Sequence, residues 1–321
     1  MIITLTPNPS LDRTLQIDAL HRGEVNRATG GRVDPGGKGV NVSRALAANG
    51  ADTAAVLPLG GPEGTQLADL LDELGIRVSP VPVSGGVRSN ITLAEPDGTT
   101  TKLNEPGPTL SEAEHTKLVS AVLDLAGPAA WVVGSGSLPG GVPQHFYADL
   151  VTAVRRTGAK VVVDSSGPAM AAVLAAAQNG SAAPDLIKPN AEELAEAVGR
   201  ELATLGDVVD AAQQLHALGI PRVLASLGAD GAVLVDESGV LHGEAPIPQP
   251  ISTVGAGDAG LAGYLSRAVD GAPARDCLTA ALGWGSAATS LPGSRMPTPS
   301  DVAAIAVIIH DEVDRDRQLK G

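Results

Sequence analysis

The stretch Ser252-Thr253-Val254-Gly255-Ala256-Gly257-Asp258-Ala259-Gly260 leads into a segment whose apolar residues recur at helical spacing, namely Leu261, Tyr264, Leu265 and Ala268. A Gly-Ala-Gly turn at a helix start lets several backbone N–H groups point outward, and the helix dipole adds positive potential there. Asp258 lies in the first helical turn, where it can take a proton from a hydroxyl. We interpret this stretch as a site of phosphoryl transfer, with Asp258 as the base and Gly255, Ala256 and Gly257 as the anion cradle.

Two other interpretations fit the glycines alone. The stretch contains G-x-G-x-x-G, the dinucleotide pattern, which needs a preceding strand and an acidic residue about 20 positions later within a βαβ unit. Here Pro246, Pro248 and Pro250 crowd the approach, and Arg275-Asp276 falls within a helical pattern. The other alternative is an ordinary helix-entry turn, and only the remainder of the chain argues against it.

The composition indicates one large α/β domain or two modest ones. Of the 321 residues 43% are hydrophobic, and the 39 glycines and 24 prolines cluster in short loops between periodic segments. Cys277 is the only cysteine, which excludes an intramolecular disulfide and a cysteine-rich metal site. The net charge of −14 argues against nucleic acid or an anionic membrane as the main partner.

The sequence also gives no sign of a membrane or secretory segment. No apolar run approaches the length of a membrane span, and the start, Met1 to Leu5, lacks the basic residues and cleavage site of a signal peptide. We therefore expect a cytoplasmic protein whose partners are small molecules.

Strand and helix patterns alternate along most of the chain, which predicts a mostly parallel sheet with right-handed crossovers. We expect strands at 2–6, 54–59, 131–133, 160–164, 186–188, 223–226 and 232–235. In such a sheet, ligands bind outside the carboxyl ends of the strands. Polar candidates fall at these ends, namely Ser137, Asp164, Lys188, Asn190, Ser226 and Asp258. Their convergence favours a functional site over a set of unrelated turns.

A second, smaller sheet is predicted near the N-terminal part of the chain. Two alternating segments, 87–94 and 99–104, flank Pro96-Asp97-Gly98, which is a strong hairpin signal. With the alternating segment 10–17 they form a sheet that is too small to fold alone and suits a lid. We expect a core of residues 1–9, 36–86 and 108–321, and a lid of residues 10–35 and 87–107.

Asp34-Pro35-Gly36-Gly37-Lys38-Gly39-Val40-Asn41 is another glycine-rich turn into a helix, and it is not a P-loop because G-x-x-x-x-G-K-[ST] is absent. A packing turn with a solvated lysine fits it equally well. Lys38, Arg88 and Lys102 are the candidate cations for an anionic substrate, which a protein of net charge −14 otherwise repels. Asp12 is either a solvated carboxylate or a ligand for sugar hydroxyls.

Asn190 and Glu193 are the candidate metal ligands. They lie three residues apart at a helix start, and one carboxylate with an amide suits Mg²⁺, which keeps several of its waters. The same spacing is that of a capping box, and both roles can hold together. The six histidines contain no pair at ligand spacing, which argues against a histidine-based transition-metal site.

Taken together, these motifs resemble those of the ribokinase-like, PfkB-type carbohydrate kinases. Gly36 to Asn41 and Thr253 to Asp258 look like the two signatures of that family, and Lys188-Pro189-Asn190 with Glu193 and the turn Ser226 to Gly231 match its intervening motifs. Residues 6–12, Arg88 with Asn90, and residues 104–108 are similar to the phosphosugar branch. The general signature begins with Asp, whereas this chain has Ser252, and the fructose-1-phosphate branch commonly carries Ser at this position. A second difference is Ala259, which stands where we expect Ser.

The resemblance implies a three-layer α/β/α sandwich with a small β-sheet lid, an ATP- and Mg²⁺-dependent kinase, and a homodimer formed through the lid. The motifs and strand ends give the expected sugar-phosphate residues, which are Asp12, Gly36, Gly37, Lys38, Asn41, Arg88, Asn90, Lys102 and Ser137. The expected nucleotide residues are Lys188, Asn190, Ser226, Leu227, Gly228, Ala229, Asp230, Gly231, Thr253, Gly255 and Gly257.

The expected reaction is phosphorylation of fructose 1-phosphate to fructose 1,6-bisphosphate. Fructose 6-phosphate and tagatose 6-phosphate are the near alternatives, since a ketofuranose carries primary hydroxyls at both ends and can enter one pocket in two orientations. A sugar-phosphate-binding regulator without turnover is the remote alternative. Asp258 speaks against it, because a pure binder needs no base.

Overall fold

The computed structural model describes residues 1–127 and 130–320. Within these residues, ten strands form one large sheet in the order β14-β13-β12-β11-β10-β9-β8-β1-β4-β5. The strands are β1 (Ile2–Leu5), β4 (Thr53–Leu59), β5 (Arg77–Pro82), β8 (Trp131–Ser135), β9 (Lys160–Asp164), β10 (Leu186–Ile187), β11 (Val223–Ser226), β12 (Ala232–Asp236), β13 (Gly239–Glu244) and β14 (Ile308–His310). The neighbours from β11 to β5 pair in parallel, and β12, β13 and β14 extend the sheet in antiparallel fashion.

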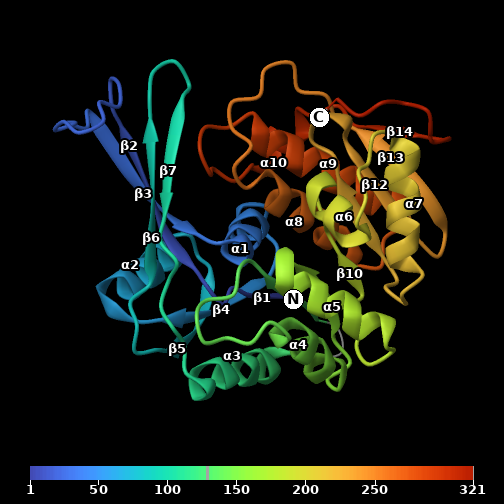
Figure 1. Cartoon of the computed structure of the whole chain (residues 1–321), viewed down its shortest axis with the longest axis horizontal. Helices are drawn as coiled ribbons and strands as arrows, with labels where there is room; N and C mark the ends of the chain where they lie inside the picture. The colour runs from blue at the N-terminus through green and yellow to red at the C-terminus, as the bar shows by residue number, and fades with distance from the viewer. Residues whose placement is uncertain (128–129, 321) are drawn as a thin grey trace.

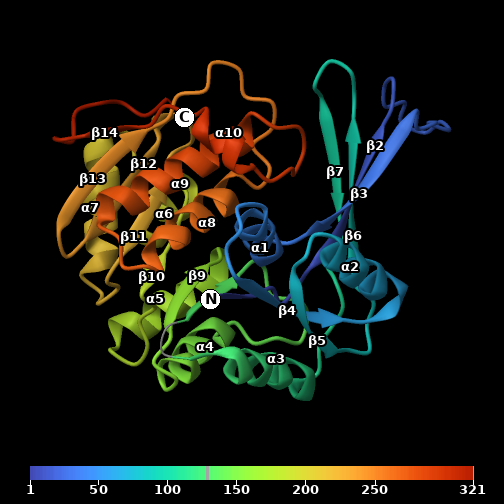
Figure 2. The same ribbon diagram turned by 180° about the vertical axis from the view of Figure 1, so that it is seen from behind.

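Helices cover both faces of this sheet, as Figures 1 and 2 show from opposite sides. They are α1 (Lys38–Ala48), α2 (Gly61–Glu73), α3 (Glu112–Leu125), α4 (Phe146–Arg155), α5 (Gly167–Gln178), α6 (Ala191–Val198), α7 (Leu205–His216), η1 (Gly228–Asp230), α8 (Ala256–Ala268), α9 (Ala274–Thr289) and α10 (Pro299–Ala303). Strand residues alternate between the faces, so that in β9 Val161 and Val163 pack with α3 to α7 while Val162 packs with α1, α8 and α9. The predicted three-layer, mostly parallel architecture is confirmed.

A separate four-stranded sheet stands beside the large one, as the projecting β2, β3, β6 and β7 show in Figure 1. Its strands are β2 (Ser10–Gln16), β3 (Gly30–Gly36), β6 (Arg88–Ala94) and β7 (Thr100–Asn104). The hairpin β6–β7 and strand β2 confirm the predicted small sheet. Strand β3 joins this sheet directly before α1, so the first three residues of the predicted glycine-rich turn, Asp34 to Gly36, are extended backbone. The division into a core and a lid at the boundaries given above stays a prediction.

Some strands carried no readable signal. β5, β13 and β14 were not predicted, because Arg77–Pro82 contains two prolines at an edge, Gly239–Glu244 contains two glycines, and Ile308–His310 is only three residues long. Helix α3 begins with a capping box, in which Ser111 and Glu114 form reciprocal hydrogen bonds.

Candidate active site

The N-terminus of α8 offers unpaired backbone donors at the edge of the sheet where the parallel strands end. Gly255 is the N-cap and adopts φ 77°, a left-handed conformation that favours glycine. No side chain caps this helix. Within the described residues, the amides of Gly255, Gly257 and Asp258 donate no hydrogen bond to a backbone or side-chain acceptor. These amides and the positive end of the helix dipole therefore form a site for an anion.

Asp258 lies inside this site, in the first turn of α8. Its side chain is buried, and its Oδ2 accepts a hydrogen bond of 2.8 Å from Nδ2 of Asn41 on α1. Burial and the nearby charge of Asp164 raise the pKa of Asp258 to about 6, although the hydrogen bond from Asn41 opposes the shift. A carboxylate with such a pKa can accept a proton near neutral pH.

Arg44 fixes the orientation of Asn41. The Nη1 group of Arg44 donates hydrogen bonds of 3.0 Å to Oδ1 of Asn41 and to the carbonyl oxygen of Pro35. Asn41 must therefore present its amide nitrogen, the donor, to Asp258.

Two lysines meet the carboxylate at the end of β9. Lys38 Nζ lies 3.0 Å from Oδ1 of Asp164, and Lys188 Nζ lies 3.6 Å from its Oδ2. Burial raises the pKa of Asp164, but the charges of Lys188 and Lys38 more than offset this, so the pKa lies below the usual value. Burial likewise lowers the pKa of Lys38, and its attraction to Asp164 and Glu193 raises it above the ordinary value overall. Lys38 is thus held charged, and Lys188 Nζ lies beside Gly257 at the α8 anion site.

Asn190 and Glu193 form the capping box of α6. Oδ1 of Asn190 accepts from the amide of Glu193 at 2.8 Å, and Oε2 of Glu193 accepts from the amide of Asn190 at 2.9 Å. The second carboxylate oxygen, Oε1, lies 3.6 Å from Lys38 Nζ and faces the site. Within residues 1–127 and 130–320, no group of three or more histidine, cysteine or acidic side chains could hold a metal alone. The magnesium role of Asn190 and Glu193 stays a prediction.

The turn between β11 and β12 lies beside the Lys188-Pro189-Asn190 segment. Ser226 donates its amide hydrogen to the carbonyl of Pro189 at 3.0 Å, and Asn190 and Ser226 form a parallel bridge. The carboxylate of Asp230 is turned to the C-terminal segment, where it pairs with Arg317 at 3.0 Å and accepts from the amide of Lys320 at 2.7 Å. The nucleotide role of this turn stays a prediction that rests on its other residues.

The lid sheet brings a second group of polar side chains together. Asp12 on β2 and Asn90 on β6 are register partners, and Nδ2 of Asn90 donates to Oδ1 of Asp12 at 3.0 Å. Ser10 donates to the same oxygen at 2.8 Å. Lys102 lies one register row further along the same face, opposite Thr92, and is exposed. The structure thus places Lys102 on the same polar face as Asp12 and Asn90.

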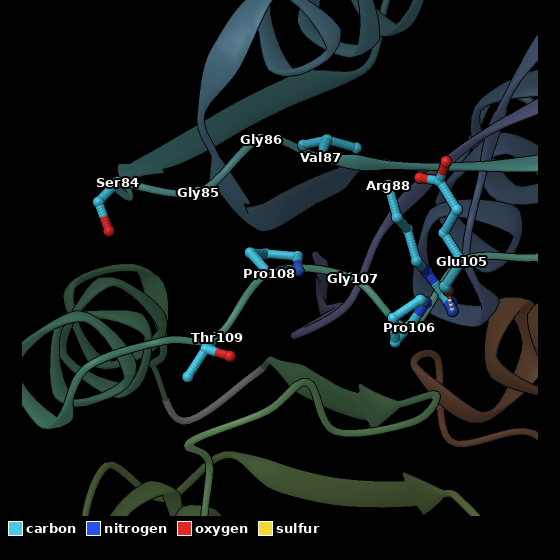
Figure 3. A pocket seen from close by; sticks show the side chains of 10 residues that line it. All are labelled: Ser84, Gly85, Gly86, Val87, Arg88, Glu105, Pro106, Gly107, Pro108 and Thr109. Atoms are coloured by element: carbon cyan, nitrogen blue, oxygen red, sulfur yellow. Dashed lines mark hydrogen bonds between the residues drawn. The ribbon is translucent and has the colours of Figure 1, made fainter.

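Arg88 lies at the base of the lid, beside a hollow of about 410 Å³ (Figure 3). Two loops form this hollow, Ser84 to Arg88 and Glu105 to Thr109. Arg88 donates through Nη1 to the carbonyl of Glu105 at 3.0 Å and through Nη2 to that of Asn8 at 3.1 Å. Nδ2 of Asn8 also donates to Oγ of Ser137, one of the predicted substrate residues, at 3.4 Å.

Several functional groups were not among the predicted site residues. Asp164 was recognised only as a polar strand end, although it joins Lys38 to Lys188, and Arg44 lay unnoticed inside a helical pattern. Six buried polar atoms lack a hydrogen-bond partner in the described part of the chain, and they belong to Thr6, Asn8, Arg88, Asn90, Ser135 and Asp164. All six residues lie at the ends of β1, β8 and β9 or at the base of the lid. Unpaired buried polar atoms that gather in one place are the pattern expected of a binding site for a polar ligand.

Several known proteins are similar to this chain over most of its length. A 1-phosphofructokinase of Haloferax volcanii is 38% identical over 303 residues, covering 94% of this chain and 95% of the relative. The ATP-dependent 6-phosphofructokinase isozyme 2 of Escherichia coli is 35% identical over 306 residues, covering 95% and 97%. The crystal structure of Escherichia coli phosphofructokinase-2 in complex with substrates and products superposes with a TM-score of 0.88 at 34% identity, covering 94% of this chain and 97% of that one.

An Arabidopsis thaliana ribokinase, at 22% identity and a TM-score of 0.72 over 94% and 97% of the two chains, shares the fold. No helix in the described residues is both long and apolar enough to cross a membrane. Residues 6–301 match the pattern of the pfkB family of carbohydrate kinases. The chain therefore belongs to the pfkB family of carbohydrate kinases.

Proposed function

We propose that this protein transfers the γ-phosphoryl group of ATP to the C6 hydroxyl of fructose 1-phosphate and yields fructose 1,6-bisphosphate. The observation that carries the proposal is the buried Asp258, with its raised pKa, among the unpaired amides of the α8 N-terminus. The relatives named 1-phosphofructokinase, at 34–38% identity over most of the chain, support the choice of substrate.

In the proposed mechanism, Asp258 accepts the proton of the attacking hydroxyl. Asn41 holds the carboxylate in place, and Arg44 holds Asn41. The amides of Gly255, Gly257 and Asp258 stabilise the negative charge on the transferred group, which is the main task of a phosphoryl-transfer enzyme, whereas the amide of Ala256 is engaged with the carbonyl of Thr253. Lys188, fixed by Asp164, adds a positive charge beside these amides. The turn 226–231 and Thr253 would receive the nucleotide.

The magnesium ion that such kinases use would neutralise charge on the nucleotide phosphates. Oε1 of Glu193 faces the site and is a hard oxygen donor, as Mg²⁺ prefers. Because Oε2 is engaged in the capping box, Glu193 and Asn190 would hold the ion largely through its waters.

The lid would bind the sugar phosphate. Asp12 and Asn90 offer acceptors and donors to the sugar hydroxyls, and Arg88 and Lys102 offer charge to the non-reacting phosphate. The unpaired Nε of Arg88 fits this role, because an arginine can contact two phosphate oxygens.

The lid also supports a homodimer. Its second face carries apolar side chains, among which Leu15 pairs with Leu93 and Ile91 pairs with Leu103, and Leu103 is 55% exposed. Packing two such faces together would bury them. Escherichia coli phosphofructokinase-2 is known in a tetrameric inhibited form, so assembly occurs in a relative. Leu103→Asp should convert a dimer to a monomer in light scattering, and an unchanged mass would contradict this interface.

Fructose 6-phosphate is the second candidate acceptor, since the relative in Escherichia coli is a 6-phosphofructokinase at 35% identity. An ADP-release assay with fructose 1-phosphate, fructose 6-phosphate, tagatose 6-phosphate and ribose tests the proposal. We expect the highest kcat/KM with fructose 1-phosphate. A higher kcat/KM with another sugar phosphate would reassign the acceptor. No turnover with any of these sugars would favour the alternative of a sugar-phosphate-binding protein without kinase activity.

A further inference from the structure

A second hollow, of about 500 Å³, lies at the edge of the large sheet where the parallel strands begin. Its walls come from the start of β8 at Trp131, the start of β9 at Lys160, and the end of α8 at Tyr264. The N-terminal turn of α9 closes another side, and α8 and α9 pack side by side (Figure 2). The candidate active site lies at the opposite edge, where the same strands end. The proposed kinase chemistry therefore leaves this hollow without a role.

Two aromatic side chains that line the hollow have unpaired polar groups. Tyr264 is only 2% exposed and Trp131 only 3%. Within residues 1–127 and 130–320, neither the Tyr264 hydroxyl nor the Trp131 indole N–H forms a hydrogen bond, whereas the hydroxyl of Tyr147 donates to Gly136 at 2.8 Å. Neither atom is among the six fully enclosed unpaired atoms described above, so solvent reaches both, and both are free to donate a hydrogen bond to a ligand.

The neighbours of Tyr264 locate its hydroxyl in the hollow. Burial raises the pKa of Tyr264, and the charges that also act on it belong to Cys277, Arg222 and Asp236, which all line the hollow.

The charged groups of the hollow favour an anion. Arg222 is half-buried and forms no ion pair within the described part of the chain. The Lys160 ammonium lies 5.2 Å from the centre of the Trp131 ring, and no carboxylate of the described residues pairs with it. α9 is 16 residues long, and its dipole adds positive potential at this end. Of the two carboxylates, Asp236 is engaged with the amide and hydroxyl of Ser238, and Glu237 is exposed.

We propose that this hollow binds a small organic anion, with its phosphate or carboxylate group held by Arg222, Tyr264 and the indole N–H of Trp131. Leu241, Ala268 and Ala272 line the same hollow and fit a short carbon chain. All the unpaired polar groups that face the ligand are donors or can act as donors, so an anion satisfies each of them. The inference does not depend on the proposed kinase reaction.

Intrinsic fluorescence tests the proposal, because the chain has two tryptophans and Trp284 lies within α9. In a Trp284→Phe background, Trp131 becomes the sole reporter. Glycerol phosphate and glutarate supply the two headgroups, and glycerol is the neutral control. We expect a saturable change with one or both anions and none with glycerol, and the anion with the lower Kd identifies the headgroup. No change with either anion at about 10 mM, in fluorescence or in calorimetry of the unaltered protein, overturns the proposal.

Variants locate the binding. Arg222→Gln should weaken binding about tenfold or more, since a charge-assisted hydrogen bond is lost. Arg155→Gln, the same change at an exposed position on α4, should not alter it. Tyr264→Phe should weaken binding several-fold without lowering Tm, because the hydroxyl has no partner in the protein. Equal affinity in Arg222→Gln and the unaltered protein contradicts the site.

Discussion

In the core part of the active site, Asp164, Lys188 and Asp258 are 0%, 5% and 8% exposed, whereas the lid residues Asp12, Arg88 and Asn90 remain partly exposed. The charge of Asp164 raises the pKa of Asp258, and the charge of Lys188 lowers the pKa of Asp164, because little solvent screens these charges. The lid groups lie on a sheet with one face open to solvent, where each charge has a smaller effect. The proton transfer is thus assigned to groups in a fixed, buried environment, and substrate recognition to groups that solvent can reach. The predictions below test this contrast.

Asp258→Asn should have the largest effect, a loss of about 10²–10⁴ in kcat with little change in KM, because a general base acts in the transition state. The raised pKa of about 6 means that a charged Asp258 lowers stability. Its stabilising contribution is complete below the ordinary pKa and is lost as the pH rises through about 6. At pH 8 the variant should therefore have an equal or higher Tm.

The matched control is Asp276→Asn, which alters an exposed carboxylate in the first turn of the neighbouring helix α9. Its kcat should stay unchanged. A kcat for Asp258→Asn above about a tenth of the original would show that Asp258 is not the base.

Arg88→Ala should have the second-largest effect, a loss of about tenfold to hundredfold in kcat/KM for fructose 1-phosphate. Turnover of unphosphorylated fructose, where measurable, should change little, because only the phosphate contact is removed. Arg13 on the opposite face of the lid sheet provides the control, since Arg13→Ala leaves the polar face intact. Equal losses with fructose and with its phosphate would assign Arg88 to the structure of the lid.

Asn41→Ala should move the acid limb of the pH–rate profile upward by about half to one pH unit. Asn41 donates to the ionised form of Asp258 and so lowers its pKa. Without this donor, Asp258 stays protonated to higher pH, and activity at pH 6.5 falls relative to pH 8. The substrate phosphate titrates identically with both proteins, so it does not affect the comparison. An acid limb at the same pH in both proteins would mean that this hydrogen bond does not set the pKa of Asp258.

Glu193→Gln should have the smallest effect, a several-fold rise in the Mg²⁺ concentration needed for half-maximal rate. Glutamine can keep the capping box, so the change in the free energy of unfolding should be below about 0.5 kcal/mol. Glu114→Gln in the capping box of α3 is the matched control, because α3 carries none of the proposed Mg²⁺ ligands. A fall in stability with unchanged Mg²⁺ dependence would reduce Glu193 to a capping residue.

Local patterns made much of this architecture predictable. Apolar periodicity and glycine turns identified most central strands and helices, and the strand ends indicated one edge of the sheet as the candidate site. The links across that edge could not be predicted, because no local pattern reports that Lys38 and Lys188 share Asp164, or that Arg44 orients Asn41. Strand β14 stayed hidden for a similar reason, since it pairs with β13, which lies more than 60 residues earlier in the chain.

The hydrogen bond between Asn41 and Asp258 joins residues 217 positions apart, and the ion pair between Lys38 and Asp164 spans 126. Strand β1, at the start of the chain, is inserted between β8 and β4. Contacts of such long sequence separation form late and make folding slow. Helices can therefore regain their circular dichroism while the catalytic groups are still apart, and recovery of enzymatic activity marks the completion of folding.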